Sequence, residues 1–387
     1  MAHTSGAMSP PARAGAPADA QDAEELLVAA RAAVDPELHR AIGSLPAAMR
    51  RIALHHFGWE GTSFPEPDQS APGVSPPAAP PAQPADPAGP LGPAVRNSSS
   101  GKAIRPALVF AAVRALGGRT AAAARAAAAV ELVHNFTLLH DDVMDRDTTR
   151  RHRPTAWTVF GTPDAILAGD ALQALAQRLL AEDPHPAAPV AAARLATCVV
   201  ELCEGQQADT AMERRGPEDV TLEECLAMAE AKTGALLGCA CALGGLYAGA
   251  ADEDVAALDA FGREAGLAFQ LIDDVIGIWG DPRRTGKPAG ADLMARKKSL
   301  PVVAALTSGT PASAELAELY RVPAIHATAD LERTVQAVER AGGRDWAQAH
   351  AADRMARAVQ HLSRAVPEPA AAGGLLALAE FVTRRSA

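Results

Sequence analysis

Aromatic side chains are scarce in this sequence, and their scarcity argues against a fold built from sheets. Phe, Trp and Tyr make up 4% of the 387 residues, whereas hydrophobic residues make up 48%, with alanine the dominant apolar residue. Strands draw on aromatic and β-branched residues, whereas alanine has the highest helix propensity. The composition therefore predicts an all-α fold.

Further absences exclude classes of function. Lys and Arg total 36 against 46 for Asp and Glu, so the net charge is −10 and nothing favours nucleic-acid binding. The five cysteines include no Cys-x-x-Cys pair, and their odd number argues against a disulfide framework. The N-terminus lacks the basic region and apolar core of a signal peptide, and no uninterrupted apolar run reaches the roughly 18 residues of a membrane span. We therefore expect a protein of the reducing cytoplasm.

Proline divides the chain into segments. Between Pro65 and Pro93 lie 11 of the 30 prolines, interleaved with Ala, Gly, Ser and Gln, a composition typical of an extended linker. We predict a disordered N-terminus (1–20), a short helical segment (21–64) with helices over 22–33 and 36–57, a disordered Pro/Ala-rich linker (65–98) and a main domain (99–387).

The main domain shows helical periodicity throughout and no convincing alternating strand. Gly and Pro residues separate the periodic segments, and Thr221-Leu-Glu-Glu224 has the pattern of a capping box. The predicted helices span 103–116, 119–144, 162–182, 187–211, 221–249, 252–279, 299–307, 311–320, 328–341, 344–363 and 369–385.

The first acidic cluster ends a long apolar segment that starts near Ala121. Asp141 and Asp145 stack one helical turn apart with Asp142 beside them, and Arg150-Arg151 follow. Carboxylates this close raise one another's pKa, and a shared cation removes that cost. Magnesium suits such hard oxygen ligands and is usually bound by one or two carboxylates together with substrate phosphates. A solvated acidic helix end is the alternative for this cluster taken alone.

The second acidic cluster makes that alternative weaker. Asp273 and Asp274 lie within the apolar segment Phe269–Trp279, and Gln270 precedes them on the same side of the predicted helix. Charges within an apolar helical face are costly unless they are paired or metal-bound. Two such clusters therefore indicate the walls of one cavity.

Basic residues near these motifs could meet an anion. Lys102 and Arg105 begin a helix, Lys232-Thr233 interrupt one, and Lys287 and Lys297 lie in a Gly-rich loop. A P-loop is excluded because Arg96 and Ala103 stand where that motif needs Gly and Ser or Thr. Together with the acids, these residues suggest a site for two diphosphates, one bridged by magnesium and the other held by Lys and Arg.

At this point the motifs resemble those of the trans-isoprenyl diphosphate synthases, or polyprenyl synthetases. The match is specific because several spaced motifs occur in the family's order, over about residues 99–303. They are Gly101-Lys-x-x-Arg-Pro106, Glu131-x-x-His134, Asp141-Asp142-x-x-Asp145 with Arg150-Arg151, Gly161 with Gly169-Asp170, Glu204-Gly-Gln206 with Asp209, Lys232-Thr233, Phe269-Gln270 with Asp273-Asp274, and Gly286-Lys287 with Asp292 and Lys297.

The resemblance implies an isoprenoid-synthase-type helical bundle around a central apolar cavity, usually assembled as a homodimer. It implies that Asp141, Asp142, Asp145, Asp273 and Asp274 hold Mg2+, with three ions per site. The residues implied to contact the allylic diphosphate are Arg150, Lys232, Thr233, Gln270, Lys287 and Lys297, and those implied to bind isopentenyl diphosphate are Lys102, Arg105, His134 and Arg151.

One position departs from the family pattern. Many members have a third Asp in the second cluster, where this chain has Gly277, and Asp281 follows one turn later. We interpret this as a weakened third ligand rather than an inactive site, because the Asp273-Asp274 pair, Gln270 and the lysine loop remain.

The length of the product is expected to be set by the helix before Asp141. Five residues of helix span about 7.5 Å, so a bulky side chain there closes the path of the growing tail. Phe136 lies five residues before Asp141, Thr137 lies four before, and the acidic motif carries no insertion. The resemblance then implies a short-chain enzyme, with a C20 product favoured over C15. Simple core packing of Phe136 is the alternative.

Two other functions fit parts of the sequence. A class I terpene cyclase shares the first acidic motif and the fold, but it would usually carry a different metal motif at 273–277 and would not need Lys102, Arg105 and His134. The segment Met49–Trp59 and the long N-terminus resemble actinobacterial synthetases that are cargo of encapsulin shells, with the N-terminal segment as the targeting element. An ordinary variable linker is the alternative for that segment.

Overall fold

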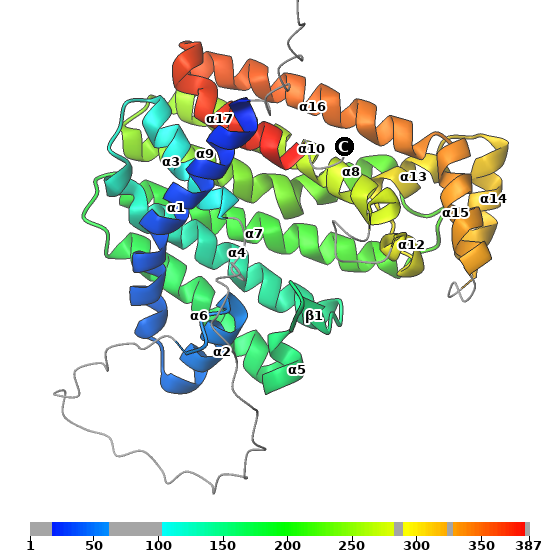
Figure 1. The fold of residues 1–387 in the computed structure, drawn as a ribbon, viewed down its shortest axis with the longest axis horizontal. Helices are drawn as coiled ribbons and strands as arrows, with labels where there is room; N and C mark the ends of the chain where they lie inside the picture. The colour runs from blue at the N-terminus through cyan, green and yellow to red at the C-terminus, as the bar shows by residue number, and fades with distance from the viewer. Residues whose placement is uncertain (1–17, 62–102, 282–288, 323–327, 384–387) are drawn as a thin grey trace, which may run out of the picture.

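A computed structural model describes residues 18–61, 103–281, 289–322 and 328–383 of the chain. These residues are almost entirely helical, so the predicted all-α fold is confirmed (Figure 1). The elements are α1 (Ala18–Gly43), α2 (Ala47–Phe57), α3 (Ile104–Ala115), η1 (Thr120–Ala123), α4 (Ala124–Met144), β1 (Thr149–Arg150), β2 (Arg153–Pro154), α5 (Ala156–Phe160), α6 (Thr162–Ala181), α7 (Ala188–Glu213), α8 (Leu222–Ala229), η2 (Glu230–Gly234), α9 (Ala235–Ala248), α10 (Asp252–Trp279), α12 (Ala291–Met294), α13 (Leu300–Leu306), α14 (Pro311–Arg321), α15 (Thr328–Arg340), α16 (Gly343–Ala365) and α17 (Pro369–Thr383).

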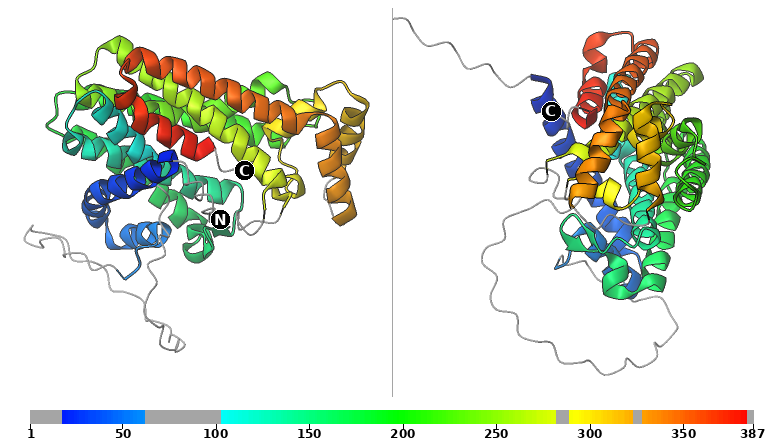
Figure 2. Two further views of the ribbon diagram at one scale, coloured as in Figure 1. Left: turned by 45° about the horizontal axis from the view of Figure 1, so that its top comes forward. Right: turned by 90° about the vertical axis from the view of Figure 1, so that its right-hand side faces the viewer.

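The long helices form one bundle around α10. Helix α10 packs against α9 and α16, while α4 packs against α6 and α3 against α9. Figure 1 shows α16 lying over α10 at one edge of the bundle, with α6 and α5 toward the opposite edge. Helices α14 and α15 pair at one end of the molecule, as Figure 2 also shows. Buried Ala, Leu and Val side chains fill the space between the helices, as the composition predicts.

The N-terminal helices belong to the same bundle. Helix α1 packs against α3, α4 and α17, and Val34, Leu38 and Ile42 are buried in the main core. The predicted break at Pro36 is wrong: α1 continues through it, since buried Val34 and Leu38 hold the helix on both sides. The chain turns instead at Ser44–Pro46. Helix α1 also begins at Ala18, inside the segment predicted to be disordered, and the predicted linker at 65–98 lies outside the described residues.

Most predicted helices of the main domain begin and end within two residues of the observed ones, and 252–279 matches α10 at both ends. The capping box is confirmed, because the Thr221 hydroxyl accepts from the Glu224 backbone N–H while the Glu224 carboxylate accepts from Thr221. The predicted helix 119–144 starts with a 3-10 turn, η1. The short hairpin β1–β2 and helix α5 were not predicted, since strands of two residues carry no alternating pattern.

The predicted helix 221–249 is interrupted by a π-helical turn, η2, between α8 and α9. Glycines bring its neighbours close: a Cβ on Gly205 of α7 would lie 2.6 Å from the Lys232 nitrogen, and one on Gly266 of α10 would lie 2.8 Å from the Gly234 Cα. Single π turns within α-helices occur frequently at functional sites. This one carries Lys232 and Thr233.

The same stretch is the one described segment that is long and apolar enough to cross a membrane. Leu222–Ala248 has a mean hydropathy of 1.3 over its most apolar window, but 67% of that window is buried inside the bundle. It therefore has the character of a core helix.

Candidate active site

One cavity of 760 Å³ gathers most of the predicted site residues. It lies between α4, α7, η2 and α10 and reaches the segment 297–300. The predicted residues that line it are Arg105, His134, Phe136, Thr137, Asp141, Asp145, Arg150, Lys232, Thr233, Gln270, Asp273, Asp274 and Lys297. Asp142 and Arg151 instead line a neighbouring space of 20 Å³, and Lys102 and Lys287 lie outside the described residues.

The first acid wall is the C-terminal end of α4. Asp141 and Asp145 line the cavity one turn apart, and the Asp145 backbone N–H donates to the Asp141 carbonyl over 2.8 Å. Burial raises the pKa of Asp141 to about 6, with Lys232 opposing and Asp145 adding to the shift. Burial likewise raises the pKa of Asp145. Both carboxylates are therefore held in an environment that disfavours their charge.

Asp142 has a different environment from its two neighbours. Its side chain is 1% exposed, and its Oδ1 accepts a hydrogen bond from Arg150 Nε over 2.7 Å. Its Oδ2 is buried and has no hydrogen-bond partner among the described residues. The structure thus places Asp142 where it orients Arg150, while Asp141 and Asp145 face the cavity.

The two acids of the second acid wall, on α10, also differ in their surroundings. Asp273 is exposed toward the cavity, whereas Asp274 is 3% exposed. Asp274 accepts from Gln270 Nε2 over 2.8 Å and from the Leu300 backbone N–H over 2.9 Å, and Lys297 Nζ lies 3.5 Å from it. The hydroxyl of Thr233 donates to Gln270 Oε1 over 2.7 Å. A relay of Thr233, Gln270 and Asp274 therefore joins η2, α10 and the segment before α13.

Two lysines that line the cavity balance the charge of the acids. Lys232 Nζ lies 2.6 Å from Asp209 Oδ2, and although burial acts against it, Asp141 and Asp209 raise the pKa of this lysine overall. Asp274, the strongest influence, raises the pKa of Lys297. Both side chains therefore remain protonated next to the acid walls.

Gly277 lies beside Asp292 rather than beside the cavity. A Cβ at Gly277 would overlap the carboxylate of Asp292, which in turn lies 4.0 Å from Lys297 Nζ. The glycine thus gives Asp292 room to approach α10 and to flank Lys297 together with Asp274. The sequence pattern records the missing acid at 277, but it does not reveal that a different acid occupies the adjacent space.

Arg105 and His134 form a second polar part of the cavity. Burial lowers the pKa of Arg105 to about 10, so the guanidinium stays charged, and its buried Nε has no partner among the described residues. Burial, with help from Arg105 and Arg151, holds the pKa of His134 well below its usual range, so this ring is neutral. Glu131 lies in the same buried group, and burial raises its pKa. An incoming anion would meet the charged guanidinium here.

Arg150 and Arg151 are presented by the hairpin β1–β2. Arg150 pairs with Arg153, and the two residues between them, Arg151 and His152, have φ angles of 52° and 62°. Two-residue hairpin loops favour positive φ, but usually with Gly, Asn or Asp at these positions. The left-handed region costs other residues roughly 1–2 kcal/mol each. The hairpin is therefore strained where it carries a predicted substrate-binding arginine.

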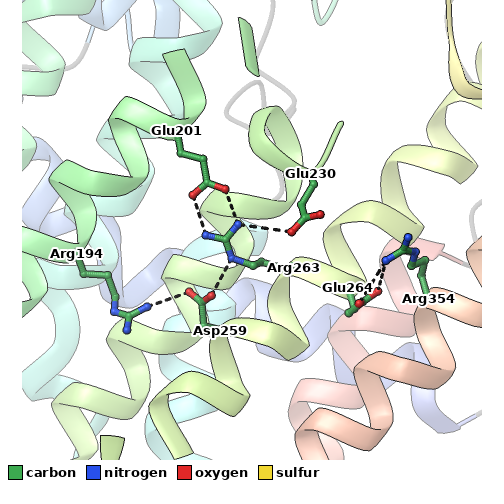
Figure 3. A network of polar contacts seen from close by, with 7 residues as sticks. All are labelled: Arg194, Glu201, Glu230, Asp259, Arg263, Glu264 and Arg354. Carbon is green, nitrogen blue, oxygen red and sulfur yellow. Dashed lines mark hydrogen bonds and ion pairs between the residues drawn. The ribbon is translucent and has the colours of Figure 1, made fainter. Parts of the chain in front are cut away.

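An ion-pair network links α7 and α10 next to η2 (Figure 3). Arg263 of α10 donates to both oxygens of Glu201 on α7, over 2.5 and 2.8 Å, and to Asp259 over 2.8 Å, while Glu230 of η2 lies 3.9 Å away. Arg194 donates to the other oxygen of Asp259 over 3.1 Å. Bidentate arginine–carboxylate pairs are geometrically specific. This network therefore holds α7 and α10 together beside the turn that carries Lys232 and Thr233.

Several residues lining the cavity were given no role from sequence. Asp209 stands in the recognised Glu204–Asp209 motif, so its pairing with Lys232 had a signal in the sequence. His140 and Cys203 also line the cavity, but no pattern marked them. His140 packs edge-on against Phe136, with ring centroids 4.8 Å apart.

The arrangement fits Mg2+ bound together with a diphosphate. Among the described residues, no three Asp, Glu, His or Cys side chains are grouped so as to hold a metal by themselves. The acids instead line two walls of one cavity, and Mg2+ is usually bound by one or two carboxylates plus substrate phosphates. The raised pKa values of Asp141 and Asp145 show carboxylates whose charge a bound cation would stabilise.

Comparisons with known proteins agree with this geometry. The family model of the polyprenyl synthetases matches residues 93–338. The chain is 47% identical over 361 residues to a geranylgeranyl diphosphate synthase of Mycobacterium tuberculosis, covering 93% of each protein. It is 40% identical over 358 residues to a (2E,6E)-farnesyl diphosphate synthase of Mycobacterium bovis, covering 92% of this chain and 91% of that protein. The crystal structure of a polyprenyl synthetase from Streptomyces coelicolor A3(2) matches with a TM-score of 0.80 and 37% identity, covering 93% of this chain and 99% of that chain.

Replacing Asp141 by Asn tests the electrostatic cost of the first acid wall. With a folded-state pKa of about 6 against 3.8 in the unfolded chain, the charged carboxylate destabilises the metal-free protein above pH 6. This destabilisation disappears as the pH falls from about 6 to 3.8, because the folded state then already holds the proton. We expect Asp141→Asn to raise the free energy of unfolding by about 1–3 kcal/mol near pH 7.5 with a chelator, and by little near pH 4. Denaturant unfolding at both pH values measures the difference.

Asp353→Asn is the matched control. Asp353 and its partner Arg357 are each 50% exposed, so this variant should change the free energy of unfolding by less than about 0.5 kcal/mol at either pH. A loss of stability in Asp141→Asn near pH 7.5 would contradict the electrostatic account.

Proposed function

The chain belongs to the polyprenyl synthetase family, and we propose that it extends an allylic diphosphate to a C20 product, geranylgeranyl diphosphate. Members of this family are Mg2+-dependent trans-prenyltransferases that use isopentenyl diphosphate and an allylic diphosphate, and this chain is a short-chain member. The match to a geranylgeranyl diphosphate synthase at 47% identity favours C20 over C15. One observation carries the proposal: two acid walls and two lysines surround a cavity that continues along the apolar side of α4.

We propose that Asp141, Asp145 and Asp273 are the residues that hold Mg2+, with three ions bound per site. When bound, these ions neutralise charge on the diphosphate as it leaves. Asp142 and Asp274, which the sequence also predicted as ligands, have their own partners within the protein. Their proposed contribution is to hold Arg150 and to fix Gln270 and Lys297.

The allylic diphosphate is held by Lys232, Lys297, Arg150 and the Thr233–Gln270 pair, with Lys287 as a further predicted contact. The carbon–oxygen bond breaks and its electron pair passes to the diphosphate, which leaves an allylic carbocation. Fixed cationic side chains stabilise the negative charge that develops, without reorganising as it forms. Arg263, which bonds Glu201 of α7 and lies 3.9 Å from Glu230 of η2, favours a fixed position for Lys232.

Isopentenyl diphosphate is bound by Arg105, Arg151 and neutral His134, with Lys102 as a further predicted contact. Its double bond attacks the carbocation to form the new carbon–carbon bond, and loss of a proton restores a double bond, with the departing diphosphate as acceptor. No nucleophile from the protein takes part. The apolar cavity walls exclude water, which would otherwise capture the carbocation.

The growing tail lies along α4 toward Phe136 and Thr137. The ring of Phe136 is 8% exposed and lines the cavity. The hydroxyl of Thr137 donates to the His134 carbonyl over 2.8 Å, so its polar group is satisfied within the helix. Leu202 lines the same cavity from α7. These contacts support the interpretation of Phe136 as the floor that limits product length.

The terpene-cyclase alternative is not favoured. The family match covers 93–338, and the relatives named above are diphosphate synthases. The cavity also contains Arg105 and His134, which a cyclase would not need.

Asp141→Ala tests the proposed reaction. Removing a carboxylate from the first acid wall should lower kcat/KM for condensation at least about 100-fold, in line with the loss of other preorganised charge-stabilising groups. The measurement is incorporation of radiolabelled isopentenyl diphosphate into extractable product with Mg2+ present. Asp164→Ala, an exposed position on α6, is the control and should keep wild-type activity. Wild-type protein that never incorporates the label would refute the proposed function.

Phe136→Ala tests the floor. Without the ring the tail can extend past this turn of α4, so we expect products longer than C20, at similar total turnover. Chromatographic analysis of chain lengths, starting from dimethylallyl, geranyl and farnesyl diphosphates, measures the shift. Phe381→Ala on α17, away from the cavity, should leave the product unchanged. An unchanged product from Phe136→Ala would place the floor elsewhere.

We also propose that the protein forms a homodimer and that its N-terminal segment targets an encapsulin shell, within the cytoplasm. The exposed apolar residues Ile166 and Leu167 on α6 and Val190 and Val200 on α7 support a helix-to-helix interface.

The targeting role is tested by removing 1–17 and shortening 65–98. The whole segment is not deleted, because α1 and α2 share the main core. Co-purification with a shell should be lost in this variant while the dimer remains. A free dimer from both proteins would refute the cargo role.

A further inference from the structure

The hairpin that carries Arg150 and Arg151 is too short to hold its own shape. Its strands have two residues each, and positive φ angles at Arg151 and His152 make its loop unfavourable. Strained backbone of this kind persists only where surrounding structure over-determines it. Some of that support is local, since the Thr155 hydroxyl and the Trp157 indole both donate to the Asp147 carbonyl over 2.8 Å.

The C-terminal end of α2 gives further support to the hairpin. His55 Nε2 lies 2.9 Å from the carbonyl oxygen of Pro154 in β2, and its Nδ1 lies 2.5 Å from Glu60 Oε1. The other oxygen of Glu60 accepts a hydrogen bond from the guanidinium of Arg153, also in β2. One carboxylate thus joins His55 to Arg153. The space left between α2 and the hairpin is only 20 Å³.

The contacts of His55 and Glu60 with β2 form a clasp on the hairpin. The end of α2 that carries this clasp is itself held in a fixed conformation. Gly58 closes the helix with φ 73°, and the Trp59 backbone N–H donates to the Leu54 carbonyl over 2.8 Å. This pattern is a Schellman cap. The Trp59 ring stacks on His39 of α1 with centroids 4.0 Å apart. Glu60, the next residue, is therefore held in place at the hairpin.

A second anchor ties α2 to α4 beside the arginine and histidine part of the cavity. His56 Nε2 lies 3.1 Å from Asn135 Oδ1, and the Asn135 amide donates to the Glu131 carbonyl over 2.8 Å. Burial lowers the pKa of His56 to about 3, so the ring is neutral and can donate from Nε2. Glu131 attracts both Arg105 and Arg151. Helix α2 therefore contacts both the hairpin, which presents Arg151, and α4, whose Glu131 attracts both arginines.

From this geometry we infer that α2 is part of the substrate site, and that Glu60 is a positioning residue that sets Arg151 for isopentenyl diphosphate. The inference rests on the proposed function, and it reaches beyond the family match, which starts at residue 93. Arg150 has its own anchor in Asp142, whereas Arg151 depends on the shape of the turn. Loosening the clasp should therefore affect the isopentenyl substrate far more than the allylic one.

Glu60→Gln tests the clasp by removing the charge that joins His55 to Arg153. We expect the KM for isopentenyl diphosphate to rise about tenfold, with kcat and the KM for the allylic diphosphate within about twofold of wild type. Arg153→Gln should give the same pattern. The double variant should be no worse than Glu60→Gln alone, because Glu60→Gln already breaks the contact that Arg153→Gln removes. Glu37→Gln is the matched control: this acid of α1 pairs with Arg40 on the same helix and should leave all constants unchanged.

Two outcomes would overturn the inference: an unchanged KM for isopentenyl diphosphate in Glu60→Gln, or equal changes in both KM values and kcat, which would indicate general loosening. Calorimetric titration with isopentenyl diphosphate alone tests the role of Glu60 separately from the proposed function. A wild-type protein without turnover would refute the proposed function, whereas the tenfold weaker binding expected of Glu60→Gln is measured without any turnover. Equal binding by wild type and Glu60→Gln would refute the clasp.

Discussion

The constraint on which the site depends is the placement of acids at the C-terminal end of α4 and within the last two turns of α10. Asp141 and Asp142 lie in the last turn of α4, Asp145 caps it, and neither α4 nor α10 has a basic residue in its last turn. A helix C-terminus carries partial negative charge, so acids there are unfavourable even before burial is counted. Helix α10 brings a second pair of acids, Asp273 and Asp274, to the same cavity. Cations near the acids offset part of this cost: Arg150 pairs with Asp142, and Lys297 Nζ lies 3.5 Å from Asp274.

The two acids of each Asp-Asp pair have different surroundings. Asp142 and Asp274 receive fixed partners, an arginine in one case and an amide, a backbone N–H and a lysine in the other. Their neighbours Asp141 and Asp273 line the cavity, as Asp274 also does, whereas Asp142 lies outside it. Adjacent positions on a helix point about 100° apart, so the two acids of each pair meet different surroundings. In each pair the second acid is buried against fixed partners, while the first lines the cavity.

The sequence alone predicted the features that depend on periodicity, but it did not predict those that depend on tertiary contacts. Helix limits such as those of α10, and the two acid clusters, follow from local pattern. The passage of α1 through Pro36 depends on burial of Val34 and Leu38, and the π turn at Lys232 depends on close packing at Gly205 and Gly266. The outward direction of Asp142 and the place of Asp292 beside Gly277 depend on partners far along the chain. No local pattern encodes them.

The hairpin shows why the N-terminal helices belong to the description of the site. A family motif records that two arginines follow the acids, but it does not say what holds them. Here a two-residue loop must place one arginine in a left-handed conformation, and a turn this short cannot supply the energy for that by itself. The support has to come from another element, and α2 lies in contact with both β2 and α4. The chain before the family motifs therefore supports the hairpin that carries Arg150 and Arg151, as well as packing in the core.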